Sequence, residues 1–176
     1  KLRAGEEPFW YELHHLKPTG WDESDTLPAW ISAEMGSMLA GLQDVFQLVW
    51  CTAWEHEANR LLSPLLGLPT DLPVIEFPAG AMRSEWAKRH LGSWKTPHIL
   101  AWLKANGLDA DGTPLPWVWA DDEVRKADRA FFAGHYGEEK GDPVAVPRWI
   151  FHIEPSHGFR RFDFDALKTW AGRTDA

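Results

Sequence analysis

The sequence has one cysteine, no long apolar run and no excess of positive charge. Because Cys51 stands alone, an intrachain disulfide and a cysteine-based zinc site are both excluded. No stretch approaches the roughly eighteen consecutive apolar residues of a membrane-spanning helix, and no signal peptide is visible. The net charge of -8 is not that of a typical nucleic-acid-binding protein, although a local basic patch is still compatible with it. We therefore expect a cytoplasmic protein with no membrane partner.

The 176 residues otherwise have an ordinary globular composition. They are 44% hydrophobic and 25% charged, which predicts a folded protein with a substantial core. The length fits a single domain over residues 1–176. Twelve residues are tryptophan, and most of these lie inside apolar runs. Tryptophans in such runs usually pack in a core and less often stack on bases, so we interpret them as core residues.

From about residue 27, strand-like apolar runs alternate with helix-like amphipathic stretches. Residues 78–94 and 134–147 are expected to be loops. Ser32 should cap the first helix, Gly67 should end the second, and Pro64 should kink it or end it early. The alternation predicts parallel βαβ units and therefore an α/β fold. The expected helices cover 33–42, 55–66, 96–105, 124–133 and 164–171, and the expected extended segments cover 26–31, 46–52, 72–77, 116–120 and 148–153.

The segment 116–122 combines an apolar strand with two adjacent carboxylates at its end. Ligands of open α/β sheets bind beyond the carboxyl ends of the strands, where Asp121 and Asp122 should lie. Paired carboxylates repel each other unless a cation or proton relieves them, and Mg²⁺ takes one or two carboxylates with phosphate and water. The pair therefore predicts a magnesium site. The alternative is that the aspartates cap a helix that starts near Glu123.

Two further polar residues occupy comparable positions in the predicted fold. Thr52 ends the strand 46–52, and Lys95 directly precedes the helix 96–105. A hydroxyl, a cation and a carboxylate pair suit phosphoryl chemistry. The hydroxyl donates to a phosphate oxygen, the lysine neutralises the transferring group, and the carboxylates hold Mg²⁺. We expect these side chains to converge on one edge of a parallel sheet.

Short segments at 48–59, 66–69, 72–74, 94–95, 117–122, 154–155 and 158–159 also match a known family. Through them the chain, from about residue 14 to residue 171, resembles a haloacid-dehalogenase-like (HAD) phosphohydrolase. It is most similar to the small HAD domains associated with RNA-repair proteins. The resemblance implies a Rossmann-like three-layer sandwich with a mostly parallel sheet. It also implies a hydrolase, namely a Mg²⁺-dependent phosphatase that acts through an aspartyl-phosphate.

The resemblance gives roles to the same four residues. Thr52 stands for the second motif of the family, Lys95 for the third, and Asp121 with Asp122 for the fourth. Thr52 and Lys95 are then the catalytic candidates within the chain, and the two aspartates are the metal ligands.

The first motif of the family has no counterpart here. In HAD enzymes it is an Asp-x-Asp at the end of the first, central strand, and it supplies the nucleophile and the general acid/base. Asp163 and Asp165 have this spacing, but they precede a helix and are interpreted as N-cap residues. We therefore expect the central strand and the nucleophile upstream of residue 1. The alternative is a non-catalytic HAD-fold module that binds nucleic-acid ends or a protein partner.

Two segments occupy the positions where the family places its caps. Residues 1–30 are expected to form a flap over a core at 31–176, and residues 78–94 lie at the other cap position. Both are short, and an uncapped site admits a large phosphorylated substrate such as a nucleic-acid end. The candidate substrate contacts are Trp54, Glu55, His56, Arg83, Lys88 and Arg89.

Overall fold

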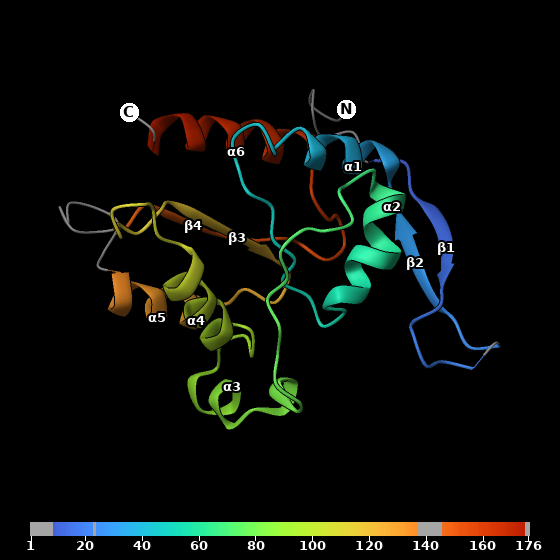
Figure 1. The fold of residues 1–176 in the computed structure, drawn as a ribbon, viewed down its shortest axis with the longest axis horizontal. Helices are drawn as coiled ribbons and strands as arrows, with labels where there is room; N and C mark the ends of the chain where they lie inside the picture. The colour runs from blue at the N-terminus through green and yellow to red at the C-terminus, as the bar shows by residue number, and fades with distance from the viewer. Residues whose placement is uncertain (1–8, 23, 137–145, 175–176) are drawn as a thin grey trace. The chain divides into compact units, whose positions relative to one another are not determined.

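The computed structural model describes residues 9–22, 24–136 and 146–174 and shows a mixed α/β protein (Figure 1). The chain forms two compact units. The first unit comprises Lys1–Ile75 and Phe159–Ala176, and the second comprises Glu76–Gly158. The α/β class is thus confirmed, while the flap at 1–30 stays a prediction. Within the described residues, no helix is long and apolar enough to cross a membrane.

The first unit begins with an antiparallel hairpin of β1 (Glu12–Leu16) and β2 (Leu27–Ile31). The extended segment predicted at 26–31 is confirmed, whereas β1 was not predicted. Neighbouring residues of a strand point to opposite faces, so His14 is half-buried while His15 is exposed. The two histidines therefore cannot both ligate one metal ion.

Helix α1 (Ala33–Ala40) starts where the sequence predicts it. The Ser32 hydroxyl accepts a hydrogen bond from the N–H of Met35 at 3.2 Å, which satisfies a free donor in the first turn. Further along the helix, Gly36 packs against the backbone of Leu66. A Cβ at this position would overlap the Leu66 carbonyl, so only glycine allows this approach of the two segments.

The helix predicted at 55–66 forms in two parts. A π-helical turn, η1 (Ala58–Leu62), leads into the short α2 (Ser63–Leu66). Pro64 has no N–H and its ring would clash with the carbonyl four residues earlier, which explains why a regular α-helix does not run through. Gly67 ends the segment with φ 67°, as predicted.

The strands predicted at 46–52 and 72–77 are wrong as full strands. They meet in one parallel bridge, in which the N–H of Trp50 donates to Pro73 and the N–H of Ile75 donates to Trp50. Pro73 has no N–H to extend the ladder on one side. On the other side, the carbonyl of Thr52 accepts the N–H of Glu55 in a turn, so it is not available to a neighbouring strand.

The core of the first unit centres on Ile31, Leu66 and Leu68. Helix α6 (Arg161–Thr174) extends the predicted helix 164–171 at both ends. It buries Phe164 and stacks Trp170 on Phe46. These contacts bring the last helix of the sequence onto the first half of the chain.

Glu57 fastens the loop after β1 to the start of the helical segment. Its carboxylate accepts the N–H and the hydroxyl of Thr19, each at 2.9 Å, and the guanidinium of Arg60. Arg60 also donates to the carbonyl of Lys17 at 2.9 Å. The hydrogen bond from Arg60, and after it the bond from the Thr19 backbone, lower the pKa of Glu57 to about 2.

This lowered pKa predicts an acid-sensitive contribution to stability. A carboxylate with a lowered pKa stabilises the folded state above its unfolded value of 4.5, and the contribution disappears as the pH falls toward about 2. We expect Glu57→Gln to lower the free energy of unfolding above pH 4.5, by an amount that shrinks below it. Urea unfolding at a series of pH values measures this difference. Arg60→Gln should give the same profile, and a difference independent of pH would contradict the prediction.

The second unit contains a parallel pair of strands, β3 (Trp117–Asp121) and β4 (Arg148–His152), which confirms two of the predicted strands. Parallel strands need a crossover, and α5 (Lys126–Tyr136) lies between them in the sequence. Helix α4 (Thr96–Asn106) precedes β3, as predicted. Most of the loop predicted at 134–147 lies outside the described residues.

Phe132 of α5 is the centre of this unit's aromatic core. Its side chain is 0% exposed, and its ring lies 4.8 Å from that of Trp117 and 6.3 Å from that of Trp119. Both tryptophans are buried and sit at alternate positions of β3, so one face of the strand packs on the helix. The interpretation of these tryptophans as core residues is confirmed.

The prediction of a loop over 78–94 is wrong. The segment contains the 3₁₀ turn η2 (Ala81–Arg83) and the helix α3 (Glu85–His90). Local contacts favour the helix, because Glu85 pairs with Lys88 at 2.7 Å and Trp86 stacks on His90. An acidic first turn and a basic last turn also suit the helix dipole.

Candidate functional site

Lys95 is the centre of the candidate site in the second unit. It immediately precedes α4, and only 8% of its surface is exposed. Its ammonium donates to Oδ2 of Asp121 at 2.7 Å and lies 3.1 Å from Oε2 of Glu123. The lysine before α4 therefore meets two carboxylates at the end of β3. The meeting of Lys95 with Asp121 was expected from the sequence, and the contact with Glu123 was not.

The surroundings of Lys95 keep it charged. Burial acts to lower the pKa of the ammonium, but the hydrogen bonds and negative charges of Asp121 and Glu123 outweigh it and raise the pKa above the ordinary value. The lysine is therefore a permanent positive charge at neutral pH.

Asp121 is held rigidly at the end of β3. Its Oδ1 accepts the N–H of Glu123 at 2.9 Å, and its Oδ2 accepts the indole N–H of Trp119 at 3.4 Å. Its backbone carbonyl accepts the N–H of Ile153, just beyond β4, at 3.0 Å. The carboxylate therefore accepts hydrogen bonds from β3 and the turn after it as well as from Lys95, and the backbone of Asp121 is bonded to the segment after β4.

Asp122 has a different environment from its neighbour, because it is exposed on the turn that follows β3. The helix α5 begins only at Lys126, and the N–H of Arg125 before it donates to Asp128. The interpretation of the Asp121–Asp122 pair as a helix cap is therefore wrong. Asp122 is exposed to solvent, whereas Oδ1 of Asp121 accepts one hydrogen bond and keeps a further lone pair.

A metal ion at this edge would rely on few protein ligands. Among the residues the structure describes, no group of three or more His, Cys, Asp or Glu side chains is arranged to hold a metal ion. Asp121 and Asp122 are the residues that could hold Mg²⁺, which commonly takes one or two carboxylates and completes its octahedron with water and substrate phosphate.

Thr52 belongs to the first unit, whereas Lys95 and Asp121 belong to the second. It is half-buried, and its hydroxyl accepts the N–H of Trp54 at 3.3 Å within the turn that follows the bridge at Trp50. Its convergence with Lys95 and the aspartates stays a prediction.

The candidate substrate contacts divide between the two units. Trp54, Glu55 and His56 belong to the turn after Thr52, where Glu55 has a positive φ of 47°. Arg83, Lys88 and Arg89 lie exposed on η2 and α3 of the second unit. Their role in binding substrate stays a prediction.

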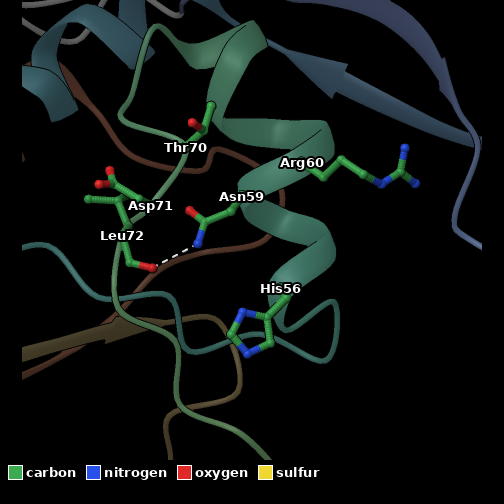
Figure 2. Close-up of a pocket in the computed structure, with 6 residues that line it drawn as sticks. All are labelled: His56, Asn59, Arg60, Thr70, Asp71 and Leu72. Atoms are coloured by element: carbon green, nitrogen blue, oxygen red, sulfur yellow. Dashed lines mark hydrogen bonds between the residues drawn. The ribbon is translucent and has the colours of Figure 1, made fainter.

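A hollow of about 620 Å³ opens on the first unit beside η1 (Figure 2). Of the candidate contacts only His56 lines it. The amide of Asn59 donates to the carbonyl of Leu72 at 2.7 Å, and Figure 2 shows the Arg60 side chain directed away from Leu72. Asn59 and Arg60 thus use their polar groups in hydrogen bonds within the protein.

Sequence reasoning missed two acidic residues, Glu123 and Asp128. Glu123 directly follows the aspartate pair, so its position offered a signal. Asp128 carried the weaker signal of an acidic residue in the first turn of a helix. Its second contact, with the turn around Lys95, depends on residues far away in the sequence.

The chain was compared with protein-family models, with curated proteins and with solved structures, and none of the three comparisons found a match.

Proposed function

We propose that the chain belongs to a Mg²⁺-dependent phosphohydrolase of the HAD type, with a Rossmann-like three-layer sandwich whose central strand comes from upstream sequence. The observation that carries the proposal is the buried contact of 2.7 Å between Lys95 and Asp121 at the carboxyl end of β3. A fixed cation beside a strand-end carboxylate suits the charge stabilisation that phosphoryl transfer uses.

In this proposal the cation and the aspartates act on different parts of the reaction. Lys95 neutralises charge on the transferring phosphoryl group, and its permanent charge supports that role. Asp121 and Asp122 hold Mg²⁺, which would supply Lewis-acid stabilisation of the phosphate oxygens. Thr52 would donate its hydroxyl to a phosphate oxygen of the substrate.

In a phosphatase of the HAD type, the nucleophile is the first aspartate of an Asp-x-Asp segment at the end of a strand, which forms the covalent phosphoryl intermediate. Within the described residues, Asp163 is buried in the first turn of α6 and accepts the N–H of Arg160 at 2.7 Å. Asp163 and Asp165 thus lie inside α6, as its third and fifth residues, and the interpretation of the pair as N-cap residues is wrong. The substrate class we propose is a phosphorylated macromolecular end, such as that of a nucleic acid.

The test compares the 176-residue chain with a version extended by its natural upstream sequence. The extended protein should hydrolyse an aryl phosphate such as p-nitrophenyl phosphate with Mg²⁺, and the chain alone should not. In the extended protein, Asp122→Asn should raise the Mg²⁺ concentration needed for half-maximal rate, because the aspartate is proposed as a ligand.

Two results would contradict the proposal. Turnover by the unextended chain would show that another carboxylate is the nucleophile, and Asp22 and Asp25 would be the first to replace. An extended protein that contains Asp-x-Asp, folds and binds Mg²⁺, yet hydrolyses nothing, would favour a non-catalytic binding module.

A further inference from the structure

Among the described residues of the second unit, Asp128 is the most completely buried carboxylate, and the proposed reaction gives it no role. Its side chain is 0% exposed. Its Oδ1 accepts the N–H of Ser93 at 2.9 Å and the hydroxyl of Thr96 at 2.6 Å, and its Oδ2 accepts the N–H of Arg125 at 2.8 Å. A buried carboxylate stabilised by three donors is costly to lose, because removing it leaves those donors without an acceptor.

These bonds join two segments that are distant in the sequence. One is the turn 92–96, which contains Lys95 and is called the Lys95 turn below. The other is the first turn of α5, which directly follows Asp121 and Glu123. Lys95 itself pairs with Asp121 and Glu123, which precede α5 in the sequence.

The Lys95 turn is shaped to fit Asp128. A Cβ at Gly92 would overlap Oδ1 of Asp128, so the carboxylate occupies space that only glycine leaves open. Ser93 and Thr96 are both buried, and the Ser93 hydroxyl accepts the N–H of Lys95 at 3.3 Å. Asp128 is therefore bonded to the chain on both sides of Lys95, through the backbone N–H of Ser93 and the hydroxyl of Thr96.

We propose that Asp128 is a positioning residue that holds the Lys95 turn at the distance from β3 at which Lys95 meets Asp121 and the phosphoryl group. The role toward the phosphoryl group rests on the proposed function, whereas the positioning of Lys95 against Asp121 does not. Asp128 touches neither the substrate nor the metal, and it acts through the backbone of Ser93 and the hydroxyl of Thr96.

The chain offers a matched control in Asp163. Asp128 is the third residue of α5 and accepts the N–H of Arg125, and Asp163 is the third residue of α6 and accepts the N–H of Arg160 at 2.7 Å. Both are buried, so both replacements remove the same kind of helix-capping bond. The two aspartates differ in one respect. Among the described bonds, Asp128 also accepts from Ser93 and Thr96 of the Lys95 turn, whereas Asp163 has no bond to that turn.

The first measurement uses the full 176-residue chain and requires no activity. Acetylation of each lysine by an activated ester is followed by mass spectrometry, with exposed Lys104 as the internal reference. Asp128→Asn should raise the rate at Lys95 roughly tenfold, because a lost bond to a charged group makes local opening that much easier. Asp163→Asn should leave the rate at Lys95 unchanged.

Thr96→Val provides a milder second variant, since it keeps the shape of the side chain and removes one bond to Asp128. It should raise the Lys95 rate by a smaller factor in the same direction. If Asp128→Asn fails to fold, Thr96→Val decides alone. An unchanged Lys95 rate in the folded variants would overturn the proposal.

The second measurement uses the extended protein and separates positioning from a general structural role. Asp128→Asn should lower kcat for an aryl phosphate by about tenfold or more with little change in KM, and Asp163→Asn should change neither. Equal losses of kcat in the two variants would overturn the proposal. If the extended protein has no activity at all, the proposed function fails, and the acetylation rates still decide whether Asp128 positions Lys95.

Discussion

Replacing Lys95 with methionine in the extended protein should lower kcat by about 10²–10³, which is the usual cost of losing one preorganised electrostatic contact to the transferring group. Methionine keeps the apolar stem of the side chain in its buried position and removes only the charge. The KM for an aryl phosphate should change far less than kcat, because the charge matters most when the phosphoryl group is in transfer.

The matched control for this variant is Lys104→Met. Lys104 lies in the last turn of α4, in the same unit and on the same helix that Lys95 precedes, and it is exposed. Its replacement should leave kcat unchanged. Because Lys95→Met leaves Asp121 buried without its cation, the variant should also lose stability, and rates should be measured at a temperature where circular dichroism shows it folded. A Lys95→Met enzyme with full kcat would remove the lysine from the mechanism.

The largest loss of stability in the second unit should follow Phe132→Ala, at about 3–5 kcal/mol. The ring is 0% exposed and lies within 6.5 Å of four aromatic rings: those of Trp117, Trp119, Phe131 and Tyr136. Alanine would remove this contact area and leave a cavity that rigid rings cannot close. The free energy of unfolding in guanidinium chloride measures the loss.

Phe162→Ala is the comparison for this variant. Phe162 is 38% exposed on α6 and its ring faces the guanidinium of Arg160 at 4.3 Å. Its removal should cost about 1 kcal/mol or less, because little apolar area and one exposed cation–π contact are lost. Equal effects of the two replacements would show that the aromatic cluster around β3 does not form the core of the second unit.

Local signals in the sequence were sufficient for much of the second unit. The apolar run before Asp121 is a strand, and the helical patterns near residues 96 and 126 are helices. In the first unit, Ser32 caps α1 and Gly67 ends α2, as predicted. Such features depend on side chains a few residues apart, so they can be predicted without knowing the rest of the fold.

The length of the strands depends on the tertiary structure and not on the local sequence. The run at 46–52 has the composition of a strand, yet a strand needs a partner with free N–H and carbonyl groups. Pro73 and the turn at Thr52 limit the pairing to one bridge at Trp50. Composition reports that a segment suits a buried sheet, but the partner's backbone decides how far the ladder extends.

The candidate site shows the same division. The sequence by itself determined that a lysine precedes α4 and that two aspartates end β3, because both positions follow from local patterns. Only the tertiary structure decided that Lys95 pairs with Asp121 rather than with exposed Asp122, that Glu123 is its second partner, and that Asp128 joins the two segments. The physical reason is that a buried charge is stable only beside its counter-charge. The packing of α5 on β3, and the bonds of Asp128 to Ser93 and Thr96, determine which carboxylate Lys95 reaches.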